Sequence, residues 1–223
     1  LEQVRHCGPS TLNQRLVSLH SWARFVGINS PEHLDWSRQL HTLHLKKHAP
    51  APMHYLEKEE MKALLAAPNR RDAQGFRDYA LLLFLYNTGA RVSEALGVHT
   101  SDLYLQPPRQ VCLRGKGRKE RMCPLWPETS AALQALMRSG TAPDGSVFTT
   151  SQHRPLSRDA VALLLSKYAR RAAATSSSLR GQRVTPHVMR HSCAVALLEA
   201  GVDVSVIRDY LGHASVATTS RYI

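Results

Sequence analysis

One segment of the chain is so rich in apolar side chains that it must lie inside the protein. Residues 80–86 read Ala-Leu-Leu-Leu-Phe-Leu-Tyr, within a stretch from Phe76 to Thr88 that predicts a helix. A helix that is apolar on all sides is buried by its neighbours. With 223 residues and 43% hydrophobic content, the chain is long enough to surround this helix with a sizeable core.

The rest of the chain predicts further helices and one hairpin. Alternating strand-like residues at 111–113 and 121–125 flank Gly115-Lys116-Gly117, whose glycines are expected to supply the positive φ of a turn. Cap residues and apolar periodicity predict helices over 10–26 with Ser10 as N-cap, 31–45, 56–67, 92–98, 128–137 and 157–173, and a helix starting at Thr185-Pro186, with Gly201 and Gly212 ending two successive helices. The predicted class is mostly α with a small antiparallel β-sheet.

A change of composition divides the chain near its first quarter. Pro50 and Pro52 disfavour a helix and favour an extended backbone. We therefore predict a helical N-terminal part at 1–48, a linker at 49–55 and a main domain at 56–223. The N-terminal part is short for an independent core, and because the chain starts at Leu1 we interpret the sequence as a piece of a longer protein.

Charge and cysteine content restrict the classes of function. Lys and Arg outnumber Asp and Glu by 29 to 17, a formal net charge of +12, which favours a polyanionic partner such as nucleic acid. The four cysteines form no C-x-x-C pair, and the chain has neither a signal peptide nor a long apolar span. We expect no disulfide framework, no zinc site and no membrane span, and a cytoplasmic location.

Residues 185–222 bring together the side chains that phosphodiester chemistry needs. Arg190 can clamp phosphate oxygens in a bidentate fork, His187 and His213 can move or donate protons, and the Tyr222 oxygen can act as a covalent nucleophile. The spacing of three residues between His187 and Arg190 predicts that both lie on one face of a helix. Each residue taken alone also fits an ordinary surface or packing role.

Two further segments add cations to this set. Arg91 has Glu94 three residues after it, which predicts an ion pair that orients the guanidinium or a purely local salt bridge. Lys116 lies between small residues that would let a turn approach a DNA backbone, although it also fits a solvated hairpin tip. A metal site at His187 and His191 is a poor fit, because Val188 stands where zinc hydrolases carry their general base.

The segment Thr88-Gly89-Ala90-Arg91-Val92-Ser93-Glu94-Ala95-Leu96, together with the order of Arg190, His213 and Tyr222, resembles the tyrosine recombinases of the phage integrase and Xer type. The resemblance covers about Leu56 to Tyr222 and implies a catalytic domain preceded by part of a helical core-binding domain that clamps DNA. It implies Tyr222 as nucleophile, Lys116 as general acid and His187 as proton acceptor. It also implies that Arg91, Arg190 and His213 stabilise the phosphate, with Glu94 in support.

The same resemblance implies the reaction and the partners. Strands of double-stranded recombination sites would be cleaved and rejoined through a 3′-phosphotyrosyl intermediate and a Holliday junction, without metal, ATP or other cofactor. A homotetramer on two duplexes would integrate or excise a mobile element in a bacterial or phage context. Type IB topoisomerase activity and a non-catalytic DNA-binding protein on the same scaffold remain the alternatives.

Overall fold

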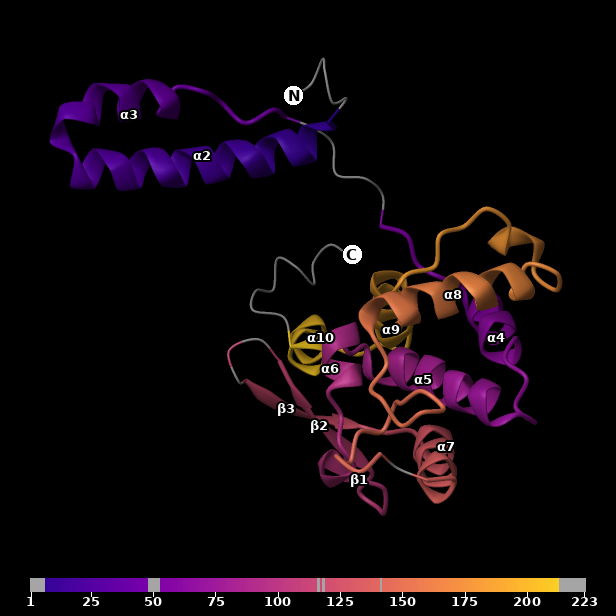
Figure 1. Cartoon of the computed structure of the whole chain (residues 1–223). Helices are drawn as coiled ribbons and strands as arrows, with labels where there is room; N and C mark the ends of the chain where they lie inside the picture. The colour runs from indigo at the N-terminus through magenta and orange to yellow at the C-terminus, as the bar shows by residue number, and fades with distance from the viewer. Residues whose placement is uncertain (1–6, 48–52, 116, 118, 141, 213–223) are drawn as a thin grey trace. The chain divides into compact units, whose positions relative to one another are not determined.

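The computed structural model of the protein describes residues 7–47, 53–115, 117, 119–140 and 142–212. The chain divides into two compact units, Leu1–Pro52 and Met53–Ile223. The predicted class is confirmed, because the described residues are mostly helical and carry a small antiparallel sheet (Figure 1).

The first unit is a pair of helices joined by a short 3₁₀ turn. Helix α2 (Pro9–Asn29) is followed by η1 (Pro31–His33) and α3 (Leu34–His41), which lies alongside α2. The Ser37 hydroxyl donates to the Ala23 carbonyl at 2.8 Å. Two predictions need correction: the N-cap is Gly8 rather than Ser10, since Pro9 already stands in the first turn, and the second helix ends at His41 rather than at 45.

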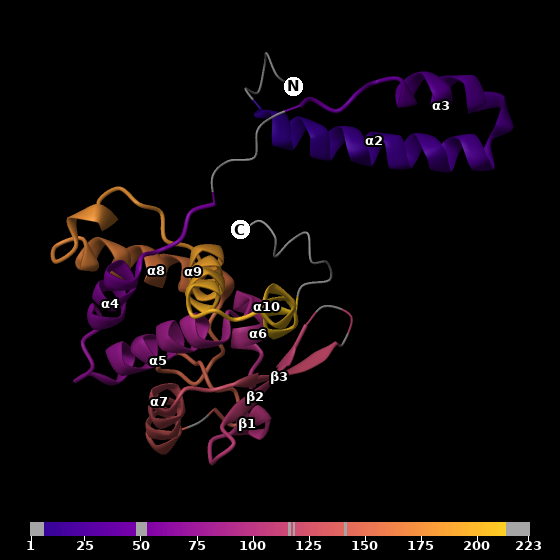
Figure 2. The same ribbon diagram turned by 180° about the vertical axis from the view of Figure 1, so that it is seen from behind.

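The second unit is built around the apolar helix predicted for residues 76–88. Helix α5 (Ala73–Thr88) lies between α7 (Pro127–Arg138) and α9 (Pro186–Glu199) (Figures 1 and 2). Residues 79–85 are all buried, and the ring of Phe84 packs against that of Phe148 with centroids 5.4 Å apart. The expectation that this helix is central to the core is confirmed.

The remaining helices begin within two residues of the starts predicted for them, except the last, for which only the end at Gly212 was predicted. They are α4 (Lys58–Ala66), α6 (Val92–Leu96), α8 (Arg158–Ala172) and α10 (Val204–Leu211), with short 3₁₀ turns at η2 (Thr100–Asp102) and η4 (Ser177–Leu179). The Ser157 hydroxyl accepts a hydrogen bond from the Ala160 amide at 3.0 Å, and Thr185 accepts one from the Val188 amide at 3.3 Å. Gly212 ends α10 in the left-handed conformation, as predicted.

In the described residues, the sheet has three antiparallel strands in the order β1 (Leu103–Tyr104), β2 (Gln110–Arg114) and β3 (Glu120–Pro124). Strand β1 was not predicted, because two residues carry no readable alternation. The hairpin closes where the Gly115 amide donates to the Lys119 carbonyl at 2.8 Å. Gly117 has φ +76°, but Gly115 does not take a positive φ, so the predicted role of the glycines is right only for Gly117.

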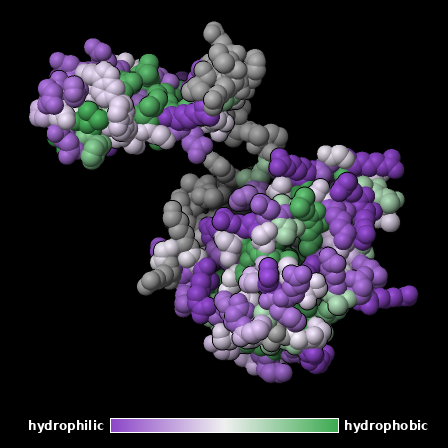
Figure 3. Space-filling view, in the orientation of Figure 1, coloured by the Kyte–Doolittle hydropathy of each residue, from purple (hydrophilic) through white to green (hydrophobic). Residues whose placement is uncertain are grey.

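Some apolar residues lie on the surface of the protein. Figure 3 shows hydrophilic residues with apolar residues among them on the visible faces of both units. In the first unit the side chains of Trp22 and Phe25 are more than half exposed. In the described part of the chain, no helix combines the length and the apolar character that crossing a bilayer requires.

The central position of α5 makes a stability prediction. Phe84→Ala removes a fully buried ring, so we expect the free energy of unfolding to fall by about 3–5 kcal/mol. Urea denaturation followed by circular dichroism measures the change. Phe25→Ala, which removes an exposed ring, is the matched control and should change stability by about 0.5 kcal/mol or less. Equal effects of the two substitutions would contradict a core centred on α5.

Candidate functional site

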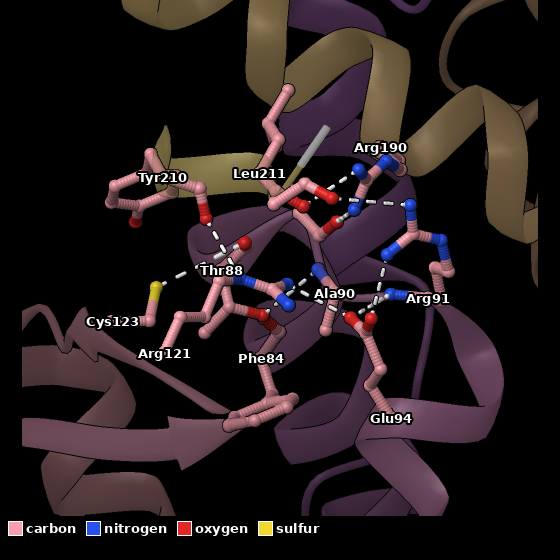
Figure 4. Close-up of polar contacts among 12 residues, drawn as sticks. Phe84, Thr88, Ala90, Arg91, Glu94, Arg121, Cys123, Arg190, Tyr210 and Leu211 are labelled. Carbon is pink, nitrogen blue, oxygen red and sulfur yellow. Dashed lines mark hydrogen bonds and ion pairs between the residues drawn. The ribbon is translucent and has the colours of Figure 1, made fainter. Parts of the chain in front are cut away.

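A buried carboxylate joins two arginines at the start of α6. The Glu94 side chain is 2% exposed, and its Oε1 accepts a hydrogen bond from Arg91 Nη1 at 2.7 Å. Its Oε2 accepts one from Arg121 Nη2 at 2.8 Å and one from the Arg91 backbone amide at 3.0 Å. Figure 4 shows the carboxylate between the two guanidinium groups. Both carboxylate oxygens are thus held by charge-assisted hydrogen bonds, which fix the direction of each arginine.

These contacts determine the charge state of Glu94. Burial alone raises the pKa of a carboxyl group, because the charged form loses its hydration. Hydrogen bonds from Arg121 and Arg91 outweigh that effect and hold the pKa of Glu94 below its usual value. Glu94 is therefore an anion at neutral pH.

A third arginine enters the same region from α9. Arg190 is 5% exposed, and its Nη1 donates to the Gly89 carbonyl at 2.6 Å. Its Nη2 donates to the Leu211 carbonyl at 2.7 Å. Arg190 thus connects the end of α5 to the end of α10, two segments far apart in the sequence (Figure 4).

The three arginines share one anchoring surface, the carboxyl end of α10. Arg121 Nε donates to the Tyr210 carbonyl at 3.0 Å, Arg190 Nη2 to that of Leu211, and Arg91 Nη2 to that of Gly212 at 3.3 Å. The last carbonyls of a helix have no partner within it and carry partial negative charge. Three guanidinium groups from three different elements therefore satisfy three successive carbonyls.

The arginines differ in their exposure to solvent, and therefore in their ability to bind a ligand. The Arg91 side chain is 42% exposed, so it can still offer N–H donors to a ligand from solvent. Arg121 is 14% exposed on its side chain and is taken up by its protein partners. A fixed arrangement of cationic donors of this kind can stabilise negative charge that develops on phosphate oxygens.

The structure brings together three of the residues singled out from the sequence: Arg91, Glu94 and Arg190. The ion pair predicted between Arg91 and Glu94 is present, and Arg121 binds the same carboxylate. Lys116, His213 and Tyr222 lie outside the described residues. The Cα of Gly115 lies against the site, where an added Cβ would come within 3.3 Å of Glu94 Oε1.

His187 lies in the first turn of α9, exposed, while Arg190 on the same helix is buried. The His187 ring stacks beside that of His191, with centroids 6.5 Å apart. Burial, followed by the nearby His187 and Arg190, lowers the pKa of His191. Within the described ranges, no three His, Cys, Asp or Glu side chains gather in a way that could hold a metal ion.

Sequence reasoning missed Arg121. It is one of several cations between 114 and 121, and neither charge nor spacing distinguishes it from the others. The usable signal was strand alternation, since Arg121 pairs with Leu113, a fully buried residue on the inner face of the sheet. Asn87 was missed too: its amide donates to the Pro124 carbonyl and the Tyr210 hydroxyl, both at 3.3 Å.

The Glu94 ion pairs predict a pH-dependent contribution to stability. A carboxyl whose pKa is lowered in the folded state stabilises the fold above its unfolded pKa, about 4.3, and this stabilisation is lost as the pH falls through the folded pKa. Glu94→Gln should therefore lower the free energy of unfolding by about 2–4 kcal/mol at pH 7. The gap between wild type and variant should shrink below about pH 4.

Urea denaturation at several pH values between 7 and 3 measures this gap. The control is Glu59→Gln, which removes an exposed pair with Lys62 and should cost less than about 1 kcal/mol at any pH. A gap for Glu94→Gln that stays constant with pH would show that the carboxylate charge contributes nothing.

Comparison with known proteins identifies the family. The model of the phage integrase family matches residues 54–223. The chain is 38% identical over 224 residues to a protein of Sinorhizobium fredii named as the integrase/recombinase y4rC, covering all of this chain and 68% of that protein. It is 32% identical over 222 residues to the tyrosine recombinase XerC of Syntrophus aciditrophicus, covering 95% of this chain and 68% of the relative.

Solved structures agree on the fold. The crystal structure of the XerA recombinase matches with a TM-score of 0.67 and 24% identity, covering 91% of this chain and 75% of that one. A Tn1549 transposon integrase in complex with circular intermediate DNA matches with a TM-score of 0.65 and 17% identity, covering 93% of this chain and 80% of that one. The resemblance seen in the sequence is confirmed: the chain belongs to the phage integrase family, the tyrosine recombinases.

Proposed function

We propose that the protein is a site-specific DNA recombinase that cleaves and rejoins strands through a covalent bond between Tyr222 and a 3′ phosphate. The observation that carries the proposal is the convergence of Arg91 and Arg190. Arg91 lies in a segment that resembles the family, and Arg190 precedes His213 and Tyr222 in the family's order. Glu94 and the end of α10 hold the two arginines. Family membership and the net charge of +12 support DNA as substrate.

The Tyr222 oxygen bonds to phosphorus and gives its proton to His187, while the 5′ oxygen leaves with a proton from Lys116. Arg91, Arg190 and His213 stabilise the non-bridging oxygens. A 5′ hydroxyl from a partner strand then attacks the phosphotyrosyl phosphorus and gives its proton to Lys116, while Tyr222 leaves and takes back the proton held by His187, so no ATP and no metal are required.

The geometry of the described residues supports these roles in two ways. The exposed position of His187 leaves its ring accessible to a substrate, as a proton acceptor requires. The exposed part of Arg91 can donate to a phosphate while Nη1 stays bonded to Glu94. The roles of Lys116, His213 and Tyr222 rest on the family resemblance.

The proposal extends to partners and domains. The substrates are double-stranded recombination sites, joined through a Holliday junction by a homotetramer on two duplexes, in the bacterial cytoplasm where this DNA lies. Residues 1–48 form part of a core-binding domain that clamps DNA, connected by the linker 49–55 to the catalytic domain 56–223. The relative named as an integrase and the transposon integrase among the solved structures favour a mobile element as the natural target.

Tyr222→Phe tests the nucleophile. A nicked duplex carrying the element's end sequence traps the cleaved state, and a denaturing gel reveals covalent protein–DNA adducts. Wild type should form the adduct, and Tyr222→Phe should form none because the attacking oxygen is gone. Tyr104→Phe, at an exposed tyrosine of β1, is the control and should match wild type. An adduct in Tyr222→Phe would exclude this residue as nucleophile, and relaxation of plasmid without strand exchange would favour a topoisomerase.

Lys116→Ala tests the general acid. We expect cleavage to slow by about 10²–10⁴-fold, because the 5′ alkoxide must then leave without a proton. Sulfur in place of the 5′ bridging oxygen should restore the rate, since a thiol of pKa about 8.5 leaves readily as an anion. Lys119→Ala serves as the control and should cleave both substrates like wild type. A defect at Lys119 that sulfur repairs would move the role to that lysine.

A further inference from the structure

Arg121 lies between two parts of the site and contacts both. It belongs to β3, and its guanidinium bonds Glu94 on α6 through Nη2 and the Tyr210 carbonyl at the end of α10 through Nε. Gly212 packs directly on this group, because an added Cβ there would come within 3.1 Å of Arg121 Nη1 and 3.3 Å of its Cζ. The guanidinium is therefore held on two edges and covered on another side by backbone.

This placement restricts how Arg91 can bind Glu94. With Arg121 in place, Glu94 Oε2 is occupied, and the Arg91 side chain bonds Oε1 alone. Without Arg121, a bidentate fork from Arg91 to both carboxylate oxygens becomes the favoured geometry. That rotation would turn Arg91 Nη2 away from the Gly212 carbonyl and direct its donors to Glu94 instead of to a ligand.

The net charge of the site also depends on Arg121. Arg91 and Arg121 bind the Glu94 carboxylate, and Arg190 binds the neighbouring Leu211 carbonyl, so the three arginines and one carboxylate carry a net charge of about +2. Loss of Arg121 leaves a net charge of about +1, which weakens the stabilisation that the cluster offers to a bound anion.

We propose that Arg121 is a positioning residue for strand cleavage: by occupying one oxygen of Glu94 and the last turn of α10, it directs Arg91 toward the scissile phosphate. The inference rests on the proposed function, because it assigns to Arg121 the orientation of an arginine that acts on phosphate. Arg121 itself contacts Glu94 and the Tyr210 carbonyl, and it acts through them.

The first test is single-turnover cleavage of the nicked duplex at saturating protein. Arg121→Met, which keeps an unbranched apolar stem and removes the guanidinium, should slow cleavage by about 10²-fold, the effect of a catalytic group misplaced by about 1 Å, while the DNA Kd changes by less than about threefold. Arg121→Lys should recover part of the rate, since an ammonium pairs with Glu94 but lacks the fork that reaches the Tyr210 carbonyl. Arg208→Met is the matched control and should cleave like wild type, because among the described residues the Arg208 side chain pairs with Asp209 on the surface of α10.

A substrate without the phosphate charge separates positioning from general loss of structure. A methylphosphonate at the scissile position removes the negative charge that Arg91 neutralises, so it should reduce the defects of Arg91→Ala and Arg121→Met alike. The two substitutions should also be non-additive, with Arg121→Met having little effect in the Arg91→Ala background. If the two rate defects multiply in the double variant, or if methylphosphonate leaves the defect of Arg121→Met unchanged, the proposal is wrong.

Spectra of the protein without DNA test the positioning role of Arg121 independently of the proposed function. In spectra of protein labelled at arginine and at the glutamate carboxyl, Arg121→Met should shift the Arg91 Nε–H signal and raise the pKa of Glu94, while Arg208→Met should do neither. If wild type forms no adduct but these changes occur, the proposed function fails and the orientation of Arg91 by Arg121 stands. Unchanged Arg91 and Glu94 signals would refute the positioning role whatever the activity.

Discussion

The ionised carboxylate of Glu94 is the constraint around which the site is arranged. A buried anion is tolerated only when its oxygens are fully hydrogen-bonded, and here Arg91 and Arg121 supply that bonding from α6 and β3. The requirement fixes the helix relative to the sheet, because neither element can move without leaving charge unpaired. Stability and site geometry therefore depend on the same contacts, and a substitution at Glu94 is expected to affect both.

The carboxyl end of α10 also orients the three arginines. Its last carbonyls would be unsatisfied in an isolated helix, and each of the three arginines donates to one of them. Cations at the negative end of a helix are also favoured electrostatically. The arginines are thus oriented before any ligand arrives, and little reorganisation remains when phosphate binds, which is the condition under which fixed donors accelerate a reaction most.

The secondary structure of this chain was largely readable from its residues. Thr185 caps the helix that it was expected to cap, and the apolar run in α5 occupies the core. Where prediction was wrong, local chemistry explains the error: Pro9 places the start of α2 one residue after Gly8, and β1 is too short to show a pattern. In the site, the spacing of Arg91 and Glu94 predicted their ion pair, because residues three apart on a helix face each other.

The sequence by itself determined the helical class, the central helix, the family and the pairing of Arg91 with Glu94, because these depend on periodicity and on residues close together in the chain. Tertiary structure alone decided that Arg121 shares the carboxylate, that Arg190 bridges the ends of α5 and α10, and that three carbonyls of α10 receive three arginines. The two carbonyls that Arg190 binds, for example, are 21 and 101 positions away from it in the sequence. Such partners are selected by packing and by the cost of leaving buried polar groups unpaired, and no local pattern encodes that selection.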